Sequence, residues 1–164
     1  MVEDVVRRHG YLMLGTRLKR IGERLQADTQ RIIDAGGAGV QGSQFTVLAA
    51  LDDLGPLTVG ELAEAVGVSQ PGVTRAVGQL ARLGLVKLRP GRDDQRQRLV
   101  TLTAKGRQTV DLGKREIWPR VVAAVADLCR DLSGPLLDQL AQLEDGLAER
   151  SLDRRPGETQ RSER

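Results

Sequence analysis

Apolar residues in the first 35 positions recur mostly at a spacing of three or four, with charged residues on either side of them. This spacing is typical of an amphipathic helix whose narrow apolar stripe can be shared with a partner helix. The pattern predicts one long helix over about residues 4–35, which ends at the glycines that follow. The stripe consists of Leu14, Leu18, Ile21, Leu25 and Ile32.

Two short helices are predicted next, because each has a capping residue at its start and a glycine at its end. Ser43 is expected to cap the first of them, which closes at Gly55. Thr58 is expected to cap the second, and Glu61 follows it at the spacing of a capping box. Gly67 then ends this second helix.

A third helix and a β-hairpin follow directly. Ser69 is the expected N-cap of the helix, and Gly84 marks its end. Strands are predicted at residues 85–88 and 98–102, with a polar loop over 89–97 between them. The region thus has the layout of a helix-turn-helix followed by a β-wing.

The last third of the chain returns to helical spacing. Thr103 is expected to cap a helix that Pro119 kinks or restarts near Trp118, and residues 133–135 read as a break before a final helix. From residue 153 the sequence is polar and predicts a disordered tail. Two further apolar stripes result: Ile117, Val121, Val125, Leu128 and Leu132, then Leu136, Leu140, Leu143 and Leu147.

These elements predict a mainly α fold with a small β-wing, in a single domain over residues 1–152. The winged helix-turn-helix occupies about residues 43–103, and helices over about 4–35 and 104–152 serve dimerisation. The alternative is that the narrow stripes pack within one subunit. The residues expected at the dimer interface are Leu14, Leu18, Ile21, Val121, Val125, Leu136, Leu140, Leu143 and Leu147.

Composition excludes several kinds of chemistry, because the chain has one histidine, His9, and one cysteine, Cys129. A structural zinc site needs about four such ligands, and a disulfide needs a second cysteine. A Ser-His-Asp site would have to use His9, close to the N-terminus. We therefore expect no catalytic residue, no metal and no cofactor, and so no enzyme. Cys129 lies beside Leu128 on an apolar stripe, where an inert buried thiol is expected rather than a redox switch.

No run of about 18 apolar residues occurs, and the N-terminus lacks the basic-then-apolar layout of a signal peptide. We expect a soluble cytoplasmic protein with no membrane partner.

The net charge of +3 hides an uneven distribution. Residues 69–107 hold nine basic and two acidic residues, a charge of +7, and the rest of the chain carries −4. A basic segment over the predicted wing and helix favours an anionic partner.

The helix after Ser69 has one apolar face and one polar face. Val73, Val77 and Leu80 are expected to pack it onto the preceding helix. The opposite face offers side chains suited to base edges and phosphates in a major groove, and arginines in the wing could reach a minor groove. The alternative is a helix whose polar face meets only water. The candidate DNA-binding residues are Ser69, Gln70, Thr74, Arg75, Gln79, Arg92, Arg96 and Arg98.

Several motifs resemble the multiple-antibiotic-resistance-regulator (MarR) family. They are LTVGELA at 57–63, VSQPGVTR at 68–75, GLV at 84–86, a D-x-R wing at 94–96 and L-T-x-x-G at 102–106. The match covers about fifty residues of the chain. One departure is Gly78-Gln79, where members often have a charged pair.

The resemblance implies a homodimeric winged-helix transcription regulator that reads a pseudo-palindromic operator in double-stranded DNA. Residues 69–83 would be the recognition helix, Arg96 would enter the minor groove, and Asp94 would position the wing arginine. The expected activity is repression, released by a small phenolic or anionic effector. Two alternatives stay open: a winged-helix module for an acidic protein partner, and a fragment related to acetyltransferase-fused regulators, which residues 14–20 resemble.

Overall fold

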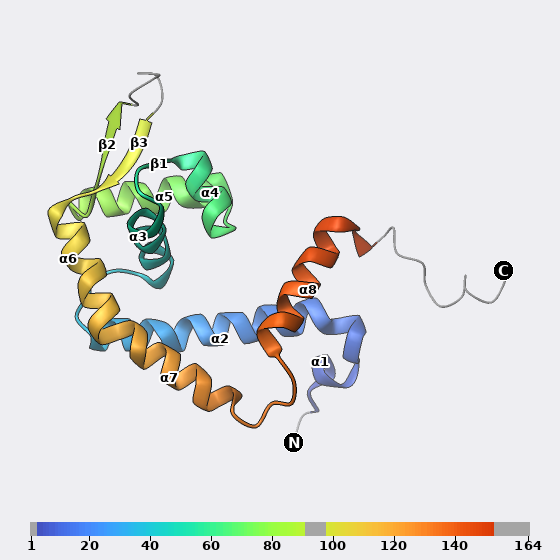
Figure 1. The fold of residues 1–164 in the computed structure, drawn as a ribbon. Helices are drawn as coiled ribbons and strands as arrows, with labels where there is room; N and C mark the ends of the chain where they lie inside the picture. The colour runs from blue at the N-terminus through green and yellow to red at the C-terminus, as the bar shows by residue number, and fades with distance from the viewer. Residues whose placement is uncertain (1–2, 91–97, 153–164) are drawn as a thin grey trace. The chain divides into compact units, whose positions relative to one another are not determined.

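A computed structural model describes residues 3–90 and 98–152 of the chain. The chain divides into two units, Met1–Ala124 and Val125–Arg164. Figure 1 shows the teal and green helices of the first unit beside a small sheet, with a hairpin extending beyond them. Three wing residues of interest, Arg92, Asp94 and Arg96, lie outside the described residues, as does the tail expected from residue 153.

The N-terminal region is helical, but the prediction of one continuous helix is wrong. It runs in three pieces: α1 (Val5–Arg8), the 3₁₀ turn η1 (Gly10–Met13) and α2 (Leu14–Ala35). Gly10 has a φ of +53°, a left-handed conformation that interrupts the right-handed α-helix between α1 and α2. Asp4 caps α1, and both guanidinium nitrogens of Arg20 donate to its carboxylate. Arg20 and the Arg7 backbone N–H hold the pKa of Asp4 below its ordinary value.

Helix α3 (Gly42–Leu54) begins earlier than the sequence predicts. Gln41, not Ser43, occupies the N-cap, and its backbone N–H donates to Oε1 of Gln44 at 2.9 Å. The expected Ser, Thr or Asp cap is thus replaced by a glutamine amide three residues into the helix. The helix ends at Gly55, as predicted, where φ is +84°.

The helix-turn-helix is confirmed as α4 (Val59–Val66) and α5 (Gln70–Arg82). Thr58 caps α4: its backbone N–H donates to Glu61 Oε2 at 2.7 Å, and its Oγ1 accepts from the Glu61 N–H at 3.2 Å. The Thr58 backbone N–H and the Thr58 hydroxyl, which lies 2.8 Å from Glu61 Oε2, both donate to the Glu61 carboxylate and so lower its pKa. Its carboxylate therefore stabilises the fold at neutral pH, and this contribution is lost as the pH falls through the lowered pKa. Gly67, in the left-handed region at φ +64°, makes the turn.

The sheet has one strand more than the sequence predicts. Its strands are β1 (Leu57–Thr58), β2 (Val86–Pro90) and β3 (Arg98–Leu102), in the order β1-β3-β2 and antiparallel throughout. Leu57 pairs with Val100, and Val86 pairs with Leu102. Strand β3 has the predicted bounds, whereas β2 starts one residue later than predicted and continues to Pro90.

The helical C-terminal region is confirmed, with a change of winding at its centre. Its elements are α6 (Ala104–Leu112), the π-helical turn η2 (Gly113–Ile117), α7 (Trp118–Cys129) and α8 (Leu136–Glu149). Thr103 caps α6, as predicted, by accepting from the Gly106 N–H at 3.0 Å. The restart expected at Pro119 coincides with the π turn, because proline has no N–H for the carbonyl one turn earlier.

The core of the first unit centres on α3 and includes α4, α5, β3 and α6. Val73, Val77 and Leu80 are buried, so the predicted packing face of α5 is confirmed. Ile117, the first residue of the apolar stripe predicted in the last third of the chain, is 1% exposed and belongs to this core.

Helix α6 lies very close to the backbone that enters β2. Thr103 donates its N–H to the Leu85 carbonyl at 3.0 Å, and its Oγ1 hydroxyl donates to the Gly84 carbonyl at 2.7 Å, with the Leu85 carbonyl as a second acceptor at 3.1 Å. A Cβ atom on Gly106 would lie 2.0 Å from the same carbonyl oxygen. The L-T-x-x-G motif therefore has a structural explanation: its threonine binds this carbonyl, and its glycine makes room for it.

Candidate nucleic-acid interface

The outer face of α5 is polar and exposed. The opposite face of the helix is apolar and buried, and it consists of Val73, Ala76, Val77 and Leu80. The side chains predicted to contact DNA lie on the other side of the helix and are exposed, as is Ser69 at the N-cap: Gln70, Thr74, Arg75 and Gln79. Arg82, near the end of the same helix, is exposed as well. The structure thus brings together all of the predicted positions on this helix.

Two of these side chains already make hydrogen bonds. Oγ1 of Thr74 donates to the Gln70 carbonyl at 2.9 Å, so its hydroxyl hydrogen is engaged and its oxygen can only accept a further hydrogen bond. Oε1 of Gln79 accepts from Nε2 of Gln44 at 2.7 Å, so its own Nε2 is the group left for a partner. Gln44 is a residue that sequence reasoning missed, since its partner is 35 positions away.

Glycine at position 78 leaves the middle of the exposed face of α5 without a side chain. A Cβ atom there would meet nothing within 4 Å. The charged pair that the family resemblance implies at 78–79 is thus absent, although the protein itself leaves room for a side chain at position 78.

The described part of the wing is basic. Lys87, Arg89 and Arg98 are exposed on β2 and β3, and Arg98 pairs with Pro90 at the end of the hairpin that the structure describes. Lys105 has a different role, because its Nζ donates to the Leu83 carbonyl at 2.9 Å and so caps the C-terminus of α5.

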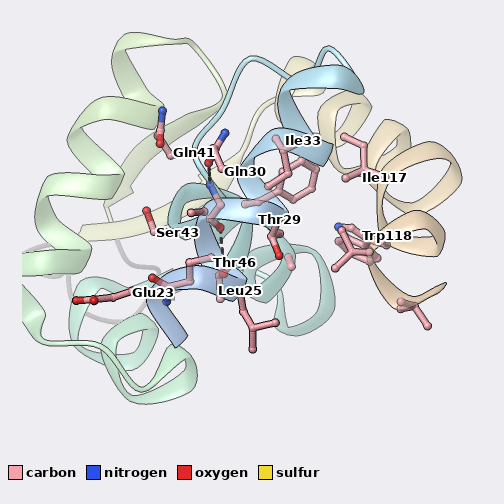
Figure 2. Close-up of a pocket in the computed structure, with 17 residues that line it drawn as sticks. Glu23, Leu25, Thr29, Gln30, Ile33, Gln41, Ser43, Thr46, Ile117 and Trp118 are labelled. Carbon is pink, nitrogen blue, oxygen red and sulfur yellow. Dashed lines mark hydrogen bonds between the residues drawn. The ribbon is translucent and has the colours of Figure 1, made fainter. Parts of the chain in front are cut away.

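A groove of about 940 Å³ lies beside α3, between α2 and the start of α7. Figure 2 shows Gln30 and Ile33 of α2, Thr46 of α3 and Trp118 of α7 around it. The rings of Phe45 and Trp118 meet edge to face, with centroids 6.1 Å apart. The wall is mostly apolar, with a few polar groups from α2 and α3. Such a composition suits a small ligand with an aromatic body.

A cation lies beside this wall. Nζ of Lys114 is 5.8 Å from the Trp118 ring centroid and donates to Oδ2 of Asp52. The Asp52 carboxylate raises the pKa of Lys114, which keeps the amine charged. Trp118 therefore lines the groove as well as packing on the core, whereas the side chain of Tyr11 is 94% exposed.

Other kinds of site are not seen in residues 3–90 and 98–152. No three His, Cys, Asp or Glu side chains there are grouped so that they could hold a metal ion. None of the helices described is both long and apolar enough to cross a membrane. Cys129 is half-buried, rather than fully buried as expected.

Three helices against a three-stranded antiparallel sheet, with the hairpin after the second helix of a helix-turn-helix, define a winged-helix fold. Solved structures share it. BpsR of Bordetella bronchiseptica has a TM-score of 0.67 at 23% identity, covering 84% of this chain and 94% of that one. CouR, a transcriptional repressor solved with a 23-mer DNA duplex, has a TM-score of 0.63 at 27% identity, covering 80% and 92%.

A model described as the MarR family matches residues 38–97. The "Transcriptional activatory protein BadR" of Rhodopseudomonas palustris is 30% identical over 146 residues, which cover 80% of this chain and 81% of that protein. The chain belongs to the MarR family. It is a transcription regulator, and its family is not one of enzymes.

Proposed function

We propose that this regulator binds a pseudo-palindromic operator as a homodimer and represses transcription in the cytoplasm. The observation that carries the proposal is the outer face of α5, where polar and cationic side chains are exposed above a fully buried apolar face. CouR, which has the same fold, is named a repressor and was solved on DNA, whereas BadR is named an activator. A reporter gene behind the operator distinguishes the two directions.

The roles of the side chains follow from their chemistry. Ser69 and Gln70, at the N-terminus of α5, would bind a phosphate together with free backbone N–H groups. Thr74, Arg75 and Gln79 would face base edges in the major groove. From the wing, Arg92, Arg96 and Arg98 would approach the minor groove, with Asp94 positioning an arginine rather than touching DNA.

Dimerisation is supported by apolar side chains that a single chain leaves exposed. Leu18 and Ile21 on α2 are 41% and 44% exposed, and Leu143 and Leu147 on α8 are 45% and 52% exposed. Leu14 and Leu140 are half-buried, and Val125 and Leu136 are exposed. Val121 differs from the rest, because it packs on the core of its own chain and lines the groove. Two copies that share these stripes would remove them from water.

Sedimentation at micromolar concentration is expected to give a species of twice 17.8 kDa. Replacing Leu143 by aspartate should shift the protein toward the monomer, because the charge would be buried in the shared stripe. Gln142→Asp adds the same charge one residue away and should leave the dimer intact. A monomeric wild type, or equal effects of the two variants, would contradict the proposed interface.

A small phenolic or anionic effector would release the operator by binding in the groove beside α3. Trp118 and Phe45 offer aromatic contact, and Lys114, which is ion-paired with Asp52, lies 5.8 Å from the Trp118 ring centroid. BpsR is a precedent in this fold, since its structure concerns regulation of DNA binding by 6-hydroxynicotinic acid. A ligand there would shift the spacing of the two recognition helices only if it favoured one spacing over the other.

The direct test is a fluorescence-anisotropy titration with duplex DNA from upstream of the protein's own gene. We expect tight binding to that duplex and much weaker binding to a scrambled duplex of equal length. Equal affinity for both, or none for either, would contradict the proposal and favour a module for an acidic protein partner. A thermal shift with acetyl-CoA would instead favour a relation to acetyltransferases.

A further inference from the structure

Two glutamine amides between α3 and α5 have their orientation fixed by a single backbone group. The Gln41 N–H can only donate, and it donates to Oε1 of Gln44 at 2.9 Å. Nε2 of Gln44 is therefore the group turned toward α5, where it lies 2.7 Å from Gln79. Because Nε2 donates, the atom that receives it must be Oε1 of Gln79. The hydrogen bonds thus run from the Gln41 backbone N–H to Gln44, and from Gln44 to Gln79.

The burial of Gln44 stabilises this orientation of its amide group. Gln44 is 5% exposed, and among the described residues it is the one buried polar side chain. An amide in such a place is stable only while its hydrogen bonds are made, and reversing it would place two donors against each other. Gln79, by contrast, is exposed on α5, so its free Nε2 lies on the surface assigned to DNA.

We propose that Gln44 is a positioning residue that determines which base edge Gln79 can read; this rests on the proposed DNA binding. A glutamine with both amide groups free pairs with adenine through one donor and one acceptor. With Oε1 bound to Gln44, Gln79 presents its Nε2 donors. These match guanine, whose N7 and O6 both accept, or thymine, whose O4 accepts, whereas adenine places a donating amine beside its one acceptor, N7.

The proposal is tested by selecting duplexes from a random pool with the full-length protein. Gln79→Ala identifies the operator position that Gln79 reads, as the position whose preference is lost. At that position the wild type is expected to prefer guanine or thymine by about tenfold, the discrimination typical of a good base contact.

Gln44→Glu should change the preference at that same position. A carboxylate still accepts from the Gln41 N–H but cannot donate, so Gln79 must turn its Nε2 inward and its Oε1 toward DNA. The preferred base should then be adenine or cytosine, whose exocyclic amines donate. Gln44→Met removes both hydrogen bonds and should only relax the preference. Gln108→Glu, the same substitution on the exposed surface of α6, should leave it unchanged.

A second route covers the case in which Gln44→Glu does not fold. Gln79→Glu keeps the bond from Gln44 and presents another acceptor oxygen, so it should also favour adenine or cytosine. The proposal is overturned if folded Gln44 variants keep the wild-type preference, or if Gln79→Ala alters no position. A wild type that selects no sequence would instead contradict the proposed function itself.

Discussion

Replacing Gly106 by alanine is expected to lower the free energy of unfolding by about 3 kcal/mol, at the upper end of the usual cost of overpacking a core. The added Cβ would lie 2.0 Å from the Leu85 carbonyl oxygen and 3.2 Å from Cδ2 of Leu102. The carbonyl belongs to the backbone and is held by a hydrogen bond from the Thr103 N–H, so it cannot turn aside as a flexible side chain could. Helix α6 would have to move away from the sheet.

Thermal and denaturant unfolding measure this loss, which should lower the melting temperature by roughly 6–12 °C in a chain of this size. Gly78→Ala is the matched control, because it makes the same change in a helix where nothing lies within 4 Å. It should stabilise the protein by about 0.5–1 kcal/mol, since alanine favours a helix over glycine. If the two variants had the same stability, the close contact at Gly106 would be refuted.

Raising the salt concentration from about 50 to 200 mM is expected to weaken operator binding by about a thousandfold or more. Each phosphate that a cation neutralises releases counterions, and a dimer would bring two copies of a segment whose charge is +7. Anisotropy titrations at four or more salt concentrations give the slope of log affinity against log salt. A flat slope would show that the basic segment does not meet the phosphates.

Replacing Arg75 and replacing Arg96 are expected to affect DNA binding in different ways. Arg75→Ala is expected to weaken binding by about 1–3 kcal/mol and to relax sequence preference, because this side chain is assigned to bases. Arg96→Ala should weaken binding and make the slope with salt shallower by about one. Arg115→Ala, on an exposed turn outside the basic segment, should change neither. Wild-type affinity in both interface variants would mean that another surface binds DNA.

The parts of the fold that could be predicted depend on residues close together in the sequence. Thr58 and Glu61 are three positions apart, and each supplies the other's hydrogen bond. Gly67 and Gly84 end their helices through their own positive φ angles. The apolar spacing on α5 likewise predicts which face of the helix is buried, because a regular helix places those residues on one side. These signals suffice for the winged helix and for its outer face.

The rest depends on contacts between distant segments. Strand β1 is two residues long and exists because Leu57 pairs with Val100. The hydrogen bond between Gln44 and Gln79 joins two helices, and neither residue differs locally from any surface glutamine. The early start of α3 also escapes prediction, because a glutamine at an N-cap is not among the residues usually preferred there. The groove beside α3 is likewise formed by three separate helices.

The edge-to-face pair in the groove wall has an optical consequence. Trp118 is the one tryptophan of the 164-residue chain, and Tyr11 and Phe45 are the remaining aromatic residues. The tryptophan fluorescence of the protein therefore arises from a single side chain, which contacts Phe45 and lies beside a charged amine. An effector in the groove would alter that emission directly, while the departure of labelled DNA is followed at another wavelength. Effector binding and operator release can thus be timed separately on the unmodified protein.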